Sequence, residues 1–258
     1  MIYVRQEKSF LGLGDLLNMF SYENRTLNNV KITYNFDEHR TILSKFLLEN
    51  VIKDKYSIER FFGNFVENEI KFNPKYKLIN HEYWPSKIKK ISTKRFSICL
   101  SLYHYKEIKK PNLDILKKYD NSNNISRKEF LEYKENCTFY KIYNKAFTTN
   151  EYNFYLNMLR NFQVFEMDHR FYLTSLSNNI KSISKSNLFV GSDGGMAHIA
   201  RILKIPSIIY FRDDSMEFNY INNVKNYVDS NLQKLCTDKN TFFNEVFQSL
   251  EDRGKLEL

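Results

Sequence analysis

The chain has 258 residues, of which 42% are hydrophobic, and a formal net charge of +9. This is enough apolar material for one large or two small cores. Three scattered cysteines without a CxxC pair argue against a disulfide framework and a structural zinc site. No apolar run approaches the roughly 20 residues that cross a bilayer, and the N-terminus lacks a signal-peptide core, so we expect a cytoplasmic protein without a transmembrane segment.

The positive charge favours a polyanionic partner, such as nucleic acid or an anionic lipid or lipopolysaccharide surface. A lysine- and asparagine-rich composition that serves only solubility is the alternative interpretation. The seven glycines are more informative, because five of them fall in two short clusters, one near residue 12 and one near residue 194. Glycine permits close approach of the backbone to another group, so we expect these clusters to form two halves of one site.

The N-terminal part is predicted to be a small α/β domain over residues 1–90. Strands are expected at 2–4, 30–36 and 77–80, and helices at 38–50 and 57–65. Gly12 and Gly14 form a loop that leads into Asp15 at the start of a helix. Leu17 stands where the dinucleotide fingerprint needs its third glycine, so an NAD site is not expected. By residue type alone, Asp15 is an N-cap.

The C-terminal part is predicted to be a second α/β domain over residues 91–258. Strands are expected at 96–103, 138–143, 163–168, 188–190 and 207–211. Helices are expected at 127–135, 149–161, 173–185, 196–204 and 237–250. Strands that alternate with helices predict a parallel sheet.

The segment from 187 to 211 predicts one strand, a polar turn, a helix and a second strand. The turn contains Gly191, Ser192, Asp193, Gly194 and Gly195, and Pro206 ends the helix. Free amides and the positive end of a helix dipole favour phosphate. We therefore expect an anion pocket for the phosphates of a nucleotide.

These residues, from Gly191 to Ala200 with Pro206, resemble the C-terminal signature of heptosyltransferase-like glycosyltransferases (the family 9-like group). A generic glycine-rich α/β turn is the alternative. The element formed by Gly12, Gly14 and Asp15 is similar to the N-terminal element of the same enzymes. The resemblance implies a GT-B fold with two Rossmann-like domains, of which the N-terminal one is reduced here, and a last helix that packs back on the N-terminal domain.

The resemblance also implies the roles of individual residues. Asp15 corresponds to the proposed general base of an inverting, metal-independent displacement. Donor binding is assigned to Gly12, Gly14, Ser192, Asp193, Gly194, Gly195, Met196 and His198. Lys106 and Lys109 are candidates for the donor phosphates, and Glu166 and Asp168 for its ribose. Ordinary alternatives are a packed histidine for His198 and surface acids for Glu166 and Asp168.

The expected function is transfer of a sugar from a nucleotide-sugar to a hydroxyl of a polyanionic acceptor. That acceptor is either a glycan such as lipopolysaccharide or a hydroxymethylated pyrimidine in phage-type DNA, which we weigh equally. No cofactor or metal is expected, because no D-x-D pair or His/Cys cluster with ligand spacing occurs. The alternatives are a non-catalytic nucleotide-sugar or nucleic-acid binding module and another nucleotide-phosphate enzyme, such as an epimerase.

Overall fold

The computed structural model describes residues 2–6, 30–34, 46, 57–60, 69–71, 89–93, 95–120, 126–167, 173–211 and 232–251. These residues form an α/β protein with parallel sheets. The predicted fold class is confirmed at that level. Within the described residues, no helix is both long and apolar enough to cross a membrane.

The main sheet has five parallel strands in the order β11-β10-β9-β5-β8. The strands are β5 (Ser97–Ser101), β8 (Gln163–Glu166), β9 (Leu188–Ser192), β10 (Ser207–Tyr210) and β11 (Gln233–Cys236). The chain moves from β5 outward to β8, returns to β9 on the other side of β5, and continues to β10 and β11. The direction of growth therefore reverses between β5 and β9, and doubly wound sheets bind ligands at such a switch point.

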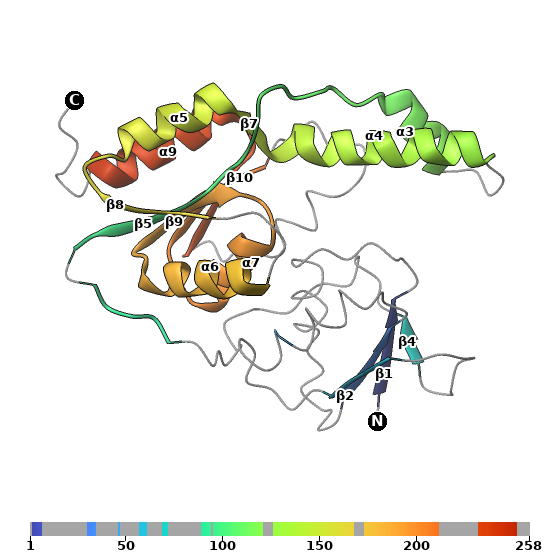
Figure 1. Ribbon diagram of the computed structural model, residues 1–258, viewed down its shortest axis with the longest axis horizontal. Helices are drawn as coiled ribbons and strands as arrows, with labels where there is room; N and C mark the ends of the chain where they lie inside the picture. The colour runs from blue at the N-terminus through green and yellow to red at the C-terminus, as the bar shows by residue number, and fades with distance from the viewer. Residues whose placement is uncertain are drawn as a thin grey trace.

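Helices cover both faces of this sheet (Figure 1). On one face lie α5 (Thr149–Met158) and α9 (Lys239–Glu251), and on the other lie α6 (Leu173–Lys185) and α7 (Gly195–Ile202). Every residue of β5, β9 and β10 is buried, as expected for strands that are covered on both sides. The bounds of α6 match the predicted helix.

A hydrophobic core of described residues lies between the sheet and the α5–α9 layer. Alternate residues of the central strands, such as Ile98, Leu100 and Val190, point into it. From α9, the core receives Phe242, Val246 and Leu250, which are fully buried. The last described helix therefore belongs to the five-stranded sheet, and its packing onto the N-terminal part stays a prediction.

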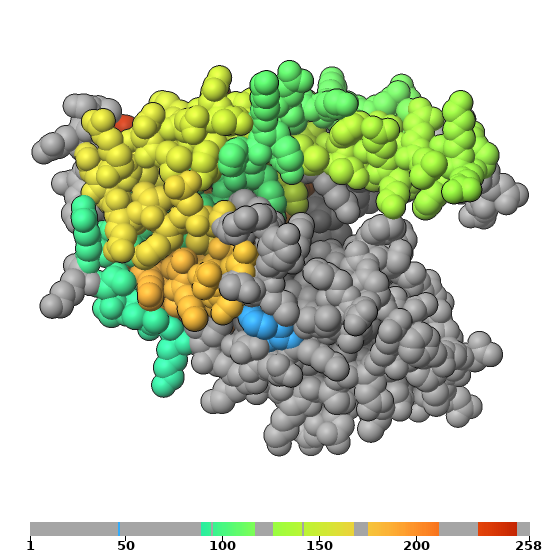
Figure 2. Space-filling model, in the orientation of Figure 1, coloured from blue at the N-terminus to red at the C-terminus, as the bar shows by residue number. Residues whose placement is uncertain are grey.

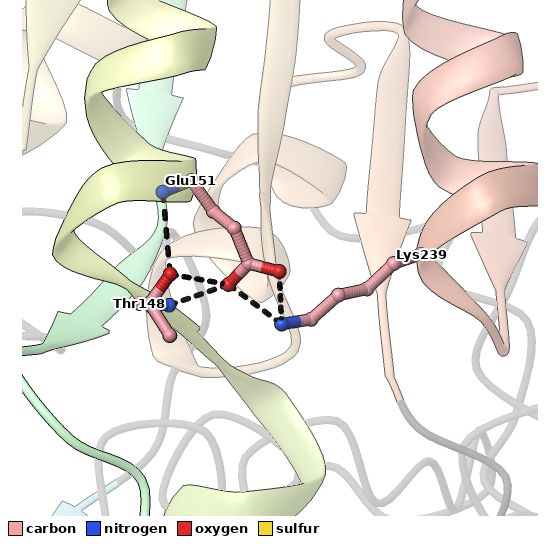
Figure 3. A network of polar contacts seen from close by, with 3 residues as sticks. All are labelled: Thr148, Glu151 and Lys239. Atoms are coloured by element: carbon pink, nitrogen blue, oxygen red, sulfur yellow. Dashed lines mark hydrogen bonds and ion pairs between the residues drawn. The ribbon is translucent and has the colours of Figure 1, made fainter.

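A polar network joins the first turns of α5 and α9 (Figure 3). The Thr148 side chain accepts the Glu151 N–H, and the Glu151 carboxylate accepts the Thr148 N–H at 2.6 Å, which forms a capping box. The Lys239 ammonium lies 2.7 Å from both carboxylate oxygens of Glu151. Although partial burial raises the pKa of Glu151, its bonds to Lys239 and Thr148 outweigh this and lower the pKa below its usual value.

Two helices and a short ribbon connect β5 to α5. The ribbon pairs β6 (Tyr103–Tyr105) in parallel with β7 (Ala146–Thr148). Between them, α3 (Leu113–Asp120) and α4 (Arg127–Lys145) lie side by side and extend away from the sheet (Figure 1). The space-filling view shows α3 and α4 at the molecular surface (Figure 2). The end of α4 leads directly into β7, and β7 leads directly into α5.

The strand predicted at 138–143 is wrong, because these residues lie inside α4. Thr, Phe, Ile and Tyr favour strands, but a capping box of Ser126 and Glu129 starts a helix upstream. The helix also satisfies its own polar groups, since the Thr138 hydroxyl donates to the Lys134 carbonyl at 3.1 Å. Helix α3 and strands β7 and β11 were not predicted.

Four N-terminal strands form a second parallel sheet, in the order β3-β2-β1-β4. They are β1 (Ile2–Gln6), β2 (Val30–Tyr34), β3 (Ser57–Arg60) and β4 (Glu69–Lys71). The first two were predicted. The helix predicted from residue 57 is wrong over 57–60, because these residues pair with β2 as a strand and pairing overrides weak local preference.

Of the helix predicted at 38–50, only Phe46 is described, and it is helical. The strand predicted at 77–80 lies outside the described residues. The division of the chain near residue 90 stays a prediction.

Candidate functional site

The site is built around the carboxyl ends of β5 and β9, on the two sides of the switch point. The pairing register places Ser101 opposite Gly191, so the residues that follow both strands emerge together. There the backbone N–H of Tyr103 donates to the side-chain oxygen of Ser192 at 3.3 Å. Ser192 is only 2% exposed. Ser192, which was predicted to bind the donor, thus joins the ends of β5 and β9 through a hydrogen bond.

Little space is left for a Cβ at two glycines of the predicted turn. A Cβ on Gly191 would lie 2.7 Å from a ring carbon of Phe189 and 2.9 Å from the Ser101 carbonyl oxygen. A Cβ on Gly194 would lie 2.9 Å from the Tyr103 hydroxyl oxygen. The glycines were predicted to allow close approach of another group, and in the structure these groups are other atoms of the protein. One of them is the Tyr103 hydroxyl, which lies beside the start of α7.

The N-terminus of α7 has no side-chain cap. Gly194 is the N-cap residue and makes no side-chain hydrogen bond, and the first turn contains no acidic residue. The amides of Gly195 and Met196 stand at this end, where a helix leaves its first N–H groups unbonded. Asp193 holds the preceding turn, because its N–H donates to the Tyr210 carbonyl at 2.9 Å. His198 lies in the first turn, is half-buried, and donates its backbone N–H to Gly194.

Two further residues at this point were not identified from the sequence. The Lys145 ammonium lies 4.8 Å from the centroid of the Tyr103 ring, a cation–π contact. Burial, together with the negative charge of Asp193, raises the pKa of Tyr103 to about 12. The phenol is therefore protonated at neutral pH and can donate a hydrogen bond.

Positional reasoning could have found one of these two residues. Tyr103 follows a buried strand, and the end of a parallel strand is where α/β sheets bind ligands. Lys145 carries no local signal, because it comes from the far end of α4. Only the β6–β7 pairing brings it to Tyr103.

The two lysines predicted to meet phosphates lie on the segment that follows β6. Lys106 is exposed in a bend. The Lys109 ammonium lies 5.1 Å from the ring centroid of Phe139 on α4. The described contact of Lys109 is thus with α4, whereas that of Lys145 is with Tyr103 at the end of β5.

A second group of side chains lies at the end of β8, beside β5. The Glu166 carboxylate accepts a hydrogen bond from the Tyr152 hydroxyl. The Tyr152 ring stacks on the His104 ring, with centroids 4.0 Å apart and planes inclined by 16°. Burial raises the pKa of Tyr152, and the bond to Glu166 raises it further.

Four of the predicted site residues lie outside the described residues: Gly12, Gly14, Asp15 and Asp168. Their roles stay predictions. Within the described ranges, no group of three or more His, Cys, Asp or Glu side chains is placed to hold a metal ion. Burial raises the pKa of the Cys99 thiol, and that of Cys236 to about 12, so neither is a thiolate at neutral pH.

Comparison of the chain with family models, with curated proteins and with solved structures gives no match.

Proposed function

We propose that this protein is a nucleotide-sugar-dependent glycosyltransferase that binds the diphosphate of its donor at the N-terminus of α7. The single observation that carries the proposal is the meeting of this uncapped helix with Tyr103 and Lys145 at the switch point of the sheet. All three supply positive charge or hydrogen-bond donors at one place. A phosphate group is the ligand that such a set of groups favours.

The same groups fit the chemistry of glycosyl transfer. When the bond from the sugar to the donor breaks, negative charge develops on the leaving diphosphate. Helix amides, a lysine ammonium and a protonated phenol stabilise such charge when they are already oriented toward it. They would supply this stabilisation from side chains and backbone alone, as the metal-independent mechanism requires.

The strand orders support a GT-B arrangement. The order β3-β2-β1-β4 follows the first four positions of a doubly wound dinucleotide fold, and the order β11-β10-β9-β5-β8 follows the other common doubly wound order. We propose that the five-stranded sheet holds the donor. Asp15 would then be the general base, as the resemblance to heptosyltransferase-like enzymes implies, and Glu166 and Asp168 would be candidates for the ribose.

The net charge of +9 supports a polyanionic acceptor. A lipopolysaccharide-type glycan and hydroxymethylated pyrimidine in DNA both meet this requirement. The two differ in their dependence on salt, because binding to DNA releases condensed counterions. Activity on DNA should fall steeply between low and moderate salt, whereas activity on a lipopolysaccharide-type glycan, which lacks the closely spaced phosphates of DNA, should fall less steeply.

The donor site can be tested by calorimetric titration of the full chain with ADP, UDP, GDP and CDP, each repeated with Lys145→Ala. We expect one or more diphosphates to bind, and the variant to bind about tenfold more weakly, since a charge-assisted contact is lost. Lys128→Ala is the matched control, because Lys128 is an exposed lysine in the first turn of the same helix. The proposed donor site would be overturned if no nucleotide bound to the chain, or if Lys145→Ala and Lys128→Ala bound nucleotides equally tightly.

A further inference from the structure

His104 is an exposed ring that is held against a buried one. One face of its imidazole lies on Tyr152, at a centroid distance of 4.0 Å. Tyr152 is only 9% exposed and belongs to the core cluster. The stacking is close to parallel, which gives a flat aromatic surface at the end of the sheet.

Several contacts fix the ring beneath His104. The Tyr152 hydroxyl donates to Glu166 at the end of β8. Tyr152 also lies in the first turns of α5, whose start is joined to α9 through Glu151 and Lys239. An exposed ring with such support loses little conformational freedom when a second flat molecule stacks on it, which favours binding.

The backbone of β6 relates this surface to the proposed phosphate site. Tyr103 and His104 are consecutive strand residues, so their side chains point to opposite sides. Tyr103 reaches the β9–α7 turn, while His104 reaches α5 near the end of β8. Since β8 and β9 flank β5, their ends are roughly 10 Å apart. An extended nucleoside diphosphate can span this separation.

We infer that the His104–Tyr152 stack is the platform on which the base of the donor nucleotide stacks, with its diphosphate at the start of α7. This inference rests on the proposed function. Glu166 acts here as a positioning residue, because it holds the Tyr152 ring that supports His104. Stacking uses the face of a base and not its edges, so purines, which have the larger face, bind more tightly than pyrimidines.

Calorimetric titration of the full chain with ADP, UDP and inorganic pyrophosphate tests the platform. His104→Ala should weaken ADP binding about tenfold, because a stacked base contributes roughly 1–3 kcal/mol. The same variant should leave pyrophosphate binding unchanged. His104→Phe keeps a flat ring and should bind ADP nearly as tightly as the unmodified chain. Tyr105→Ala is the matched control, because Tyr105 is an exposed aromatic residue of the same strand.

The outcomes separate the two proposals. Unchanged ADP binding by His104→Ala, or an equal loss with Tyr105→Ala, would overturn the platform and leave the phosphate site intact. Failure of the unmodified chain to bind either pyrophosphate or nucleotides would overturn the proposed function and the platform with it. NMR gives a readout that needs no substitution: the ring protons of His104 should shift upfield with ADP and not with pyrophosphate. Equal shifts with both ligands would contradict stacking.

Discussion

Two lysines in this protein lie over aromatic rings at nearly the same distance, yet their surroundings differ. Lys239 is 4.9 Å from the Phe147 ring centroid and is paired with Glu151. Lys145 is 4.8 Å from the Tyr103 ring centroid, and no carboxylate among the described residues is paired with it. Among the described residues, the first lysine therefore has a carboxylate partner, whereas the second has none and lies beside the switch point.

The neighbouring helix starts differ in the same way. Thr148 and Glu151 cap the N-terminus of α5 from within. The N-terminus of α7 begins at a glycine without a side-chain cap. One helix start is therefore capped by its own chain and serves stability, while the other has no side-chain cap and is the one that we propose binds an external anion.

The largest expected effect concerns the turn that shapes the second helix start. Gly191→Ala should destabilise the protein by about 1–3 kcal/mol, because its new Cβ would meet the Phe189 ring and the Ser101 carbonyl inside a packed sheet. Gly194→Ala should cost less, since it meets only the Tyr103 side chain, which can move. Urea denaturation of both variants measures the difference. Equal losses of stability would mean that the backbone carbonyl beside Gly191 does not make this glycine harder to replace than Gly194.

The next effect separates the two lysines directly. Lys145→Ala should weaken nucleotide binding about tenfold and change the melting temperature little, because we propose that this lysine contacts the ligand and no carboxylate among the described residues is paired with it. Lys239→Ala should do the reverse, with nucleotide binding kept and the melting temperature lowered, since it leaves Glu151 without its cation. Calorimetry of both variants measures nucleotide binding, and thermal melting of both measures stability. Comparable losses of binding in the two variants would remove the distinction.

The smallest effect is the pH dependence of the Glu151 network. The folded protein lowers the pKa of Glu151 from the usual 4.5 of a glutamate. Its ion pair therefore stabilises the fold above that pH, and the stabilisation is lost as pH falls through the lower, folded-state pKa. Because both side chains are about one-third exposed, the contribution should stay below about 1 kcal/mol.

Glu151→Gln tests this sign. The variant should melt slightly below the unmodified protein at pH 7, and the difference in melting temperature should vanish as the pH falls below the folded-state pKa of Glu151. A difference that persists or grows in acid would mean that the network does not stabilise the charged carboxylate.

Local sequence signals were enough to predict the central strand–turn–helix–strand unit, the helix at 173–185 and the parallel character of the sheet. These follow from local signals: short apolar runs, the helical spacing of apolar residues, glycines in the turn and Pro206 after the helix. The start of α5 was also predictable, because the acidic side chain of Glu151 lies in the first turn and complements the helix dipole there. The glycines of the turn correctly predicted that another group lies close to the backbone, but the sequence did not show that this group belongs to the protein.

Which side chains meet depends on how distant parts of the chain pack together. Pairing with β2 made 57–60 a strand, and an upstream capping box carried α4 through 138–143. The strand order placed the end of β5 beside that of β9, and the β6–β7 ribbon brought Lys145 to Tyr103. The stack of His104 on Tyr152 likewise joins β6 to α5. Such contacts depend on which strands pair across long stretches of chain, and local preferences do not encode that choice.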